Sequence, residues 1–288
     1  MTSRAEYNNP QGLGKLGLPY QYEMISDPSR VLPFKMAINK SCKGKVVFES
    51  GTGSGIMSIL AARAGAKRVY ATEIDPDMAN FARENINKNK LQNIIKVIQK
   101  DTRKVTLDDL DGERVDVVIA ENLSTWEVME PEISILNHIN EYLINEEGIR
   151  IPETIYNYFE LAYSKYNFED SIELRTYYFE FSGIKEPEIF SDRIIFEEIN
   201  LSKINPLENK KSITAKVNKN GIVNSVRLTS PLKLFNNITF NSSDSLMPPV
   251  IFPLQKDINC ISGDKLSLTF KYSFEKGWEN FYCQAEKI

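Results

Sequence analysis

The sequence predicts an α/β domain with a parallel sheet, followed by an antiparallel β-barrel or sandwich domain. Before residue 150, short apolar runs alternate with helix-like segments, and this order requires a parallel sheet with helices on both faces. After it, short runs rich in Tyr, Phe, Ile and Thr are separated by Asn-, Gly- and Pro-containing turns, which is typical of antiparallel sheets. We therefore expect three regions: a flexible segment over 1–20, an α/β domain over 21–150 and a β-rich domain over 151–288.

In the α/β domain, residues 21–150, the expected strands and helices follow from apolar periodicity and helix-start signals. Asp75 is a suitable cap before Pro76, which favours a first helical turn. The expected strands are Val46–Phe48, Arg68–Thr72, Ile94–Ile98 and Val115–Ala120, and the expected helices are Ile56–Ala64, Pro76–Lys88 and Pro131–Leu143. In the β-rich region we expect strands at Ile155–Ala162, Thr176–Phe181, Arg193–Ile199, Ser212–Val217, Ile222–Leu228, Asn237–Asn241 and Lys265–Tyr272.

Composition excludes several classes of protein. The 288 residues carry 35 Lys and Arg against 39 Asp and Glu, a net charge of −4 that does not suggest a nucleic-acid or anionic-membrane partner. No apolar run is long enough for a membrane span, and the N-terminus lacks a secretory h-region. Cys42, Cys260 and Cys283 lie far apart, which indicates free thiols in the cytoplasm and no zinc site. A single histidine, His138, makes a histidine-ligated metal site improbable, and we expect no metal.

The strongest local motif is a strand that runs into three glycines, Gly51, Gly53 and Gly55, and then opens a helix. Glycines at this point allow a tight turn and close approach of the backbone to a ligand. About twenty residues on, Glu73 closes the second strand, where an acid can bind ribose hydroxyls. Asp101 follows the third strand, near the place of an adenine amino group. Since no phosphate-binding lysine accompanies the loop, the pattern predicts S-adenosyl-L-methionine, with Glu49, Ile74 and Thr102 as flanking contacts.

These residues resemble class I methyltransferases, and Gly51–Pro76 is similar to ribosomal-protein L11 methyltransferases. The flanks are instead similar to protein arginine methyltransferases. Glu23-Met-Ile-Ser-Asp-Pro-Ser-Arg30 resembles the E-M-L-x-D-x-x-R segment of that family, and residues 147–153 resemble its turn into the β-barrel domain. The resemblance implies a Rossmann-like fold, Arg30 on the methionine carboxylate of the cofactor and Met24 near its sulfonium.

Two glutamates follow the fourth strand nine positions apart, as in arginine methyltransferases: Glu121 and Glu130. The resemblance makes both catalytic and substrate-binding, with Glu121 also beside the cofactor. Two carboxylates can hold a guanidinium by forked hydrogen bonds and bias its charge, so that one nitrogen is free to attack a methyl group. Trp126 either walls this pocket or packs inward, and Asn122 is a further polar contact. Glu130 could also be an ordinary acid at a helix start.

The sequence also departs from the arginine methyltransferases. The Y-F-x-x-Y motif and the T-H-W loop are absent; Ser245–Met247 is the nearest counterpart of that loop. The stretch from Tyr177 to Asn200 is too short for the helical dimerisation arm, which makes the family's ring dimer doubtful. The leading hypothesis is methylation of a guanidino or amine nitrogen in a protein or peptide. One alternative is a methyltransferase with another acceptor: a lysine, an amino-terminal amine or a small molecule. The other alternative is a module that binds S-adenosylmethionine without catalysis.

Overall fold

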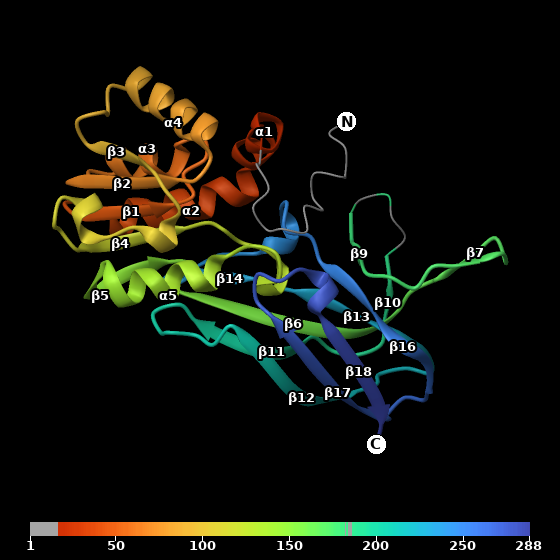
Figure 1. The fold of residues 1–288 in the computed structure, drawn as a ribbon. Helices are drawn as coiled ribbons and strands as arrows, with labels where there is room; N and C mark the ends of the chain where they lie inside the picture. Colours follow the sequence, from red (N-terminus) through yellow and green to blue (C-terminus); the bar gives the residue numbers. More distant parts are fainter. Residues whose placement is uncertain (1–16, 182, 184–185) are drawn as a thin grey trace.

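The computed structural model describes residues 17–181, 183 and 186–288, and it consists of a parallel-sheet part followed by an antiparallel part (Figure 1). The first part contains five parallel strands in the order β3-β2-β1-β4-β5. The strands are β1 (Val46–Ser50), β2 (Arg68–Glu73), β3 (Ile95–Gln99), β4 (Val115–Ala120) and β5 (Ile144–Ile151). Strands β1 and β4 are almost wholly buried, as expected for parallel strands covered on both faces.

Five α-helices accompany this sheet: α1 (Leu18–Ser26), α2 (Pro28–Ser41), α3 (Ile56–Arg63), α4 (Pro76–Lys88) and α5 (Glu132–Tyr142). The expected cap is present, because the carboxylate of Asp75 accepts from the backbone N–H groups of Asp77 and Met78 at the start of α4. None of the described helices is long and apolar enough to cross a bilayer.

Helices α1 and α2 were not expected, and they change the prediction for the N-terminal segment. Residues 1–16 of the flexible segment lie outside the described residues, whereas Leu18–Tyr20 belong to α1. Helix α2 begins with Asp27 as cap and Pro28 in the first turn, the same start signal that was recognised at Asp75. The interior Pro33 obscured the pattern, since proline inside a helix normally ends or kinks it.

The chain leaves the parallel sheet at Ile151, the end of β5, and enters a separate antiparallel sheet at Thr154, the start of β6. Eight antiparallel strands share one sheet, with the path β15-β14-β6-β13-β16-β9 and with β10 and β11 also paired to β6; a second sheet has the order β12-β17-β18, and β7 pairs with β8 in a hairpin. Their bounds are β6 (Thr154–Tyr163), β7 (Asn167–Phe168), β8 (Ile172–Glu173), β9 (Tyr178–Phe179), β10 (Glu188–Ile189), β11 (Ile194–Asn200), β12 (Glu208–Lys216), β13 (Gly221–Thr229), β14 (Leu232–Phe235), β15 (Ile238–Phe240), β16 (Val250–Cys260), β17 (Lys265–Ser273) and β18 (Tyr282–Lys287).

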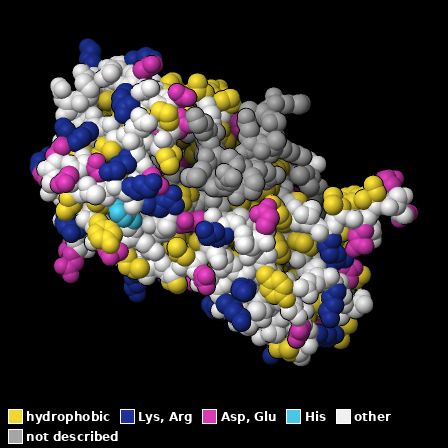
Figure 2. All heavy atoms as spheres, in the orientation of Figure 1, with side chains coloured by type: hydrophobic (Ala, Val, Ile, Leu, Met, Phe, Trp, Pro, Cys, Tyr) yellow, Lys and Arg dark blue, Asp and Glu magenta, His cyan; other side chains and the backbone are white. Residues whose placement is uncertain are grey.

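An aromatic core joins the two larger antiparallel sheets. Phe159 of β6 contacts Phe270 of β17 with ring centroids 5.2 Å apart, and Phe252 of β16 contacts Phe281 at 4.7 Å. Phe159, Phe270 and Phe281 are buried and Phe252 is partly buried, and aromatic rings of this size contribute strongly to the stability of a core. On the face shown in Figure 2, acidic and basic side chains are interspersed over the surface.

Strand β16 was missed because it contains Pro253, and proline in a run argues against a central strand. The structure tolerates it at an irregularity: Val223 pairs with Ile258, but Ser225, two residues on, pairs with Pro253. Four residues of β16, 254–257, therefore lie opposite Asn224 alone. Pro253 thus stands at the edge of a bulge, one of the places where a strand accepts proline.

Candidate active site

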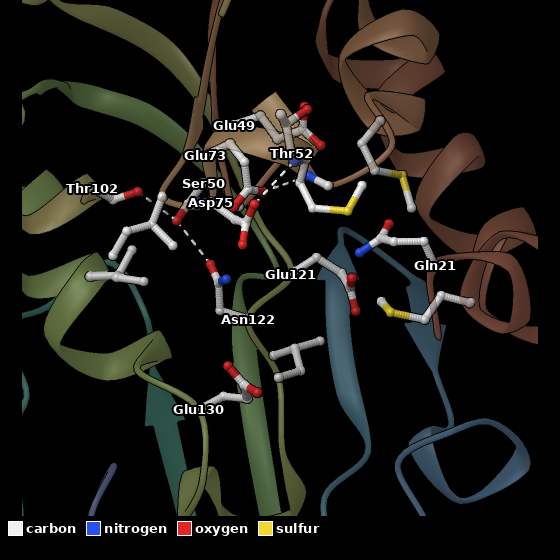
Figure 3. Close-up of a pocket in the computed structure, with 18 of the residues that line it drawn as sticks. Gln21, Glu49, Ser50, Thr52, Glu73, Asp75, Thr102, Glu121, Asn122 and Glu130 are labelled. Atoms are coloured by element: carbon white, nitrogen blue, oxygen red, sulfur yellow. Dashed lines mark hydrogen bonds between the residues drawn. The ribbon is translucent and has the colours of Figure 1, made fainter. Parts of the chain in front are cut away.

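A cavity of about 350 Å³ lies at the carboxyl ends of β1, β2 and β4, bounded by α1, the start of α2 and the loop after β4. Its volume lies in the range of small-molecule sites. In the strand order β3-β2-β1-β4-β5, this is the point where the connections from β1 reverse direction, the usual ligand position in such sheets. Figure 3 shows labelled side chains from α1, β1, β2 and the loop after β4 directed at one space.

The glycine loop, residues 51–55, forms one wall. Gly51 and Gly53 line the cavity with φ angles of +67° and +51°. A Cβ on Gly51 would lie 2.5 Å from Nδ2 of Asn122, and one on Gly53 would lie 2.5 Å from Oε1 of Gln21. A side chain at either position would therefore collide with another wall of the site, which explains why glycine stands there.

Gly55 corrects the prediction. It does not line the cavity but caps α3 with a φ of +86°, because the chain has already turned away into the helix.

Glu73 lies at the end of β2, on the cavity wall, and is 9% exposed. Its carboxylate accepts from the backbone N–H of Gly53 at 2.9 Å and from that of Asp75 at 3.0 Å. Each oxygen is held by one backbone donor and keeps a second lone pair. Ile74, the next residue, lines the same wall with 54% of its surface exposed.

Asp101 and Thr102 also line the cavity. Arg103 holds the Asp101 carboxylate in a fork, with Nε 3.0 Å from Oδ1 and Nη2 2.9 Å from Oδ2. Burial raises the pKa of Asp101, but the hydrogen bonds and charge of Arg103 outweigh it, so that the pKa is lowered overall. Asp101 is thus an ionised acceptor, oriented by its own sequence neighbour.

Glu49, predicted to contact the cofactor, is a cavity-lining residue only 3% exposed. Its Oε2 accepts from the hydroxyl of Thr52 at 2.6 Å and from that of Ser58. Burial raises the pKa of Glu49 to about 7 in spite of these donors. The side chain therefore ties the glycine loop to α3 as well as facing the cavity.

Arg30 and Met24 come from α2 and α1, and both line the cavity. Arg30 is 3% exposed, and its guanidinium donates from Nη2 to Oε1 of Glu121 and lies 5.8 Å from the ring centroid of Phe240. It is therefore a buried cation at the junction of the glycine-loop wall and the acceptor loop, residues 121–130.

Glu121 and Glu130 both line the cavity, at the two ends of the acceptor loop (Figure 3). Burial raises the pKa of Glu121, although the charge of Arg30 opposes this rise. Burial also raises the pKa of Glu130 to about 7; the charge of Glu121 adds to the rise and that of Arg30 reduces it. The two predicted catalytic carboxyls thus face one buried space, and the charge of Glu121 affects the pKa of Glu130.

Asn122 lines the cavity between these acids and the glycine loop. Its Oδ1 accepts from the hydroxyl of Ser50 at 2.8 Å, and that hydroxyl lies 3.0 Å from the hydroxyl of Thr102. The amide nitrogen is therefore the group next to Gly51. Asn122 offers a donor to the cavity, while its acceptor atom is occupied.

Trp126 does not wall the pocket, and that prediction is wrong. It is fully buried and stacks on Phe196 with ring centroids 4.8 Å apart, while its indole N–H donates to the carbonyl of Tyr158 at 3.1 Å. A φ of +59° at Trp126 turns the chain so that the indole enters the aromatic core between the sheets. The inward packing that the sequence left open is the arrangement observed.

The sequence did not single out Gln21, Ser50 or Glu132. Gln21 accepts from the backbone N–H of Ser54 at 3.1 Å and so joins α1 to the glycine loop. Glu132 accepts from the backbone N–H of Asn122 at 3.3 Å. Gln21 lies in no motif, and Glu132 is indistinguishable in sequence from other acids at a helix start.

The residues present fit S-adenosylmethionine. The side-chain-free glycine loop provides room for close approach, Glu73 offers lone pairs to a ribose diol, and the Arg30 guanidinium matches a carboxylate. The cationic side chains on the described cavity wall are Arg30, Lys100 and Arg103, and the last two are paired with Asp109 and Asp101. The donor set thus suits a nucleoside with an amino-acid tail better than a nucleotide phosphate.

Comparison with known proteins agrees with this fit. Residues 34–151 match the family model of ribosomal protein L11 methyltransferases. The chain is 32% identical over 260 residues to the uncharacterized protein MJ1452 of Methanocaldococcus jannaschii, an alignment that covers 90% of this chain and 92% of that protein.

Two relatives with named activities match a little under half of the chain. Protein arginine N-methyltransferase PRMT10 of Oryza sativa subsp. japonica is 34% identical over 138 residues, which are 47% of this chain and 35% of that protein. An arginine N(omega)-methyltransferase of Streptomyces achromogenes subsp. streptozoticus is 31% identical over 135 residues, 46% of this chain and 37% of that protein. The chain thus spans little more than a third of the length of either relative.

Solved structures match almost the whole chain in fold. The Trypanosoma brucei PRMT1 enzyme–prozyme complex with AdoHcy gives a TM-score of 0.77 at 15% identity, covering 95% of this chain and 98% of that one. Arabidopsis thaliana protein arginine methyltransferase 10 gives 0.76 at 18% identity, covering 94% and 98%. The chain therefore belongs to the same family as the Methanocaldococcus protein, and it is a divergent class I S-adenosylmethionine-dependent methyltransferase related to the protein arginine methyltransferases.

Proposed function

We propose that this enzyme transfers a methyl group to a guanidino or amine nitrogen of a protein or peptide, with arginine as the first choice. The observation that supports this proposal is that Glu121 and Glu130 face the same cavity as the glycine loop. A cation is the ligand that two neighbouring buried carboxyls favour, because it offsets their charge where water cannot.

The residues of the acceptor loop have a defined task in this reaction. S-adenosylmethionine supplies a methyl carbon activated by a sulfonium. Glu121 and Glu130 would hold the acceptor by charge-assisted hydrogen bonds and draw its positive charge toward themselves. One nitrogen then keeps electron density for attack, and catalysis rests on positioning and electrostatics. Arg30, paired with Glu121, would fix that carboxylate against the cofactor side of the site.

Two other acceptors compete with arginine in a protein. The first is a lysine or amino-terminal amine, which the match to the L11 methyltransferase model favours. The second is free arginine, which the name of the Streptomyces relative, arginine N(omega)-methyltransferase, favours. We prefer a peptide-borne arginine because a pair of carboxyls matches the fork of a guanidinium better than a single ammonium. We further propose that residues 151–288 support the acceptor loop, since Trp126 anchors it in the aromatic core, and that the enzyme is cytoplasmic, with its cysteines buried as free thiols.

The decisive experiment is mass spectrometry of candidate peptides after incubation with the enzyme and isotopically labelled S-adenosylmethionine. The peptide set carries arginine, lysine and a free amino terminus in separate members, and free arginine is included. Label on arginine in a peptide is the expected result. Label confined to lysine or the amino terminus would overturn the guanidino assignment, and label on free arginine alone would overturn the peptide assignment.

A further inference from the structure

A buried carboxyl that the two-glutamate motif does not include lies directly behind the acceptor loop. Glu132, the first residue of α5, is fully buried, and its side chain turns back toward the acceptor loop. Its Oε2 accepts from the backbone N–H of Asn122 at 3.3 Å. Asn122 directly follows Glu121, so that this contact fixes the backbone from which a catalytic carboxylate extends.

The other oxygen of Glu132 is buried and has no hydrogen-bond partner among the described residues. An ionised carboxylate with a single long hydrogen bond would be poorly compensated for its loss of water. The groups that face Glu132 are three further acids, Glu121, Glu127 and Glu130, and the Asn122 amide. Nothing in this set offsets a negative charge.

Charge balance among the protein's own groups leads to the same result. Arg30 is already paired with Glu121, so it is not free to offset a third carboxylate. The other cations on the described wall, Lys100 and Arg103, are paired with Asp109 and Asp101. An ionised Glu132 would add a negative charge that repels the two catalytic carboxylates.

We propose that Glu132 is a positioning residue that works as a neutral carboxylic acid, and that it holds the start of the acceptor loop through the backbone of Asn122. This inference rests on the proposed function only for its kinetic consequences. Burial is the main cause that raises the pKa of Glu132 to about 8; the charges of Glu121 and Glu130 add to the rise, and the hydrogen bond from Asn122 opposes it. The neutral form therefore predominates at neutral pH.

The test compares Glu132→Gln with Glu132→Ala, using the full chain. Glutamine keeps the shape and the acceptor oxygen but cannot ionise, whereas alanine removes the hydrogen bond. We expect E132Q to retain kcat/KM within about threefold at pH 7 and E132A to lose at least about tenfold, because misplacing a positioned group is costly. Glu141→Gln, an exposed change on the same helix, is the matched control.

The pH profile separates positioning by a neutral acid from a merely structural role. Wild-type kcat/KM should fall above about pH 8, where free-enzyme Glu132 ionises, and the E132Q profile should lack this alkaline limb. An E132Q variant as impaired as E132A, or one that keeps the wild-type alkaline limb, would overturn the proposal.

A stability measurement tests the protonation state without any acceptor. The folded pKa lies above the ordinary value of 4.5, so the folded protein keeps a proton that the unfolded chain loses, and the contribution of Glu132 to wild-type stability falls from pH 4.5 to 8. The Tm of E132Q relative to wild type should therefore rise across that window, by about 2 °C or more. A constant difference would sink the neutral-acid assignment. A rising difference without any arginine methylation would leave Glu132 as proposed and reject the acceptor.

Discussion

Arg30 and Glu121 form a buried ion pair although 91 positions separate them in the chain. Arg30 lies upstream of the first strand, and Glu121 follows the fourth. Both side chains are largely removed from water, at 4% and 12% exposure. The pair thus joins the wall that fits the cofactor to the wall that fits the acceptor.

Replacing Glu121 by glutamine tests the acceptor wall. The variant keeps the shape of the side chain but loses the charge that pairs with Arg30 and would hold a cation. We expect kcat/KM to fall by at least about 100-fold, as for the loss of an electrostatic contact in a buried site. Affinity for S-adenosylhomocysteine, measured by calorimetry, should stay within about threefold. Glu147→Gln, an exposed position, serves as the control; full activity of the Glu121 variant would rule out the two-carboxylate mechanism.

Replacing Glu73 by alanine tests the ribose contact. The change removes the carboxylate that would accept from the two ribose hydroxyls, and it also leaves the backbone N–H groups of Gly53 and Asp75 without this acceptor. We expect the affinity for S-adenosylhomocysteine to fall by about 100-fold or more, because hydrogen bonds to a charged group are each worth about 1.5–3 kcal/mol. Calorimetry against Glu84→Ala, an exposed site on α4, gives the comparison. Affinity equal to that of wild type would contradict the ribose assignment.

The pKa of Glu130 predicts an acid limb in the pH profile. Burial raises this pKa to about 7, and the neutral form below that pH cannot offset a cationic acceptor. The kcat/KM of the enzyme for the methyl acceptor should therefore rise as the pH increases through about 7. The Glu130→Gln variant should be weakly active and lack this limb in stopped assays from pH 5.5 to 8. An unchanged limb in that variant would assign the ionisation to another group.

Trp126 should matter for stability more than for acceptor recognition. Truncation to alanine removes an indole that contacts Phe196, Phe270, Tyr272 and Phe281 in the core. We expect a loss of about 3–5 kcal/mol in the free energy of unfolding, measured with urea. Trp126→Phe should recover part of this stability and keep the acceptor KM. A phenylalanine variant that is stable but has a greatly raised acceptor KM would return Trp126 to the pocket wall.

The sequence by itself determined the local features. The strand, three glycines and helix of residues 46–63 follow from neighbouring residues, because a tight turn between a buried strand and a helix depends on backbone freedom at Gly51 and Gly53. Glu73, at the end of β2, was likewise identifiable from the sequence, because it lies only 20 positions after Gly53 of the glycine loop. Strands β1 to β4 and several of the antiparallel strands were predictable from periodicity, whereas β5, β16 and β18 were not.

Only the tertiary structure decided how distant segments meet. A φ above zero at Trp126 and the packing of two sheets send the indole into the core, and no local pattern specifies either. Strand β16 depends on a bulge in its partner's register that accommodates Pro253. Glu132 looks like any acid at a helix start, but complete burial against Asn122 gives it a distinct protonation state. The physical reason is common to all three: burial and long-range contacts set charge and orientation, and both depend on residues far away in the chain.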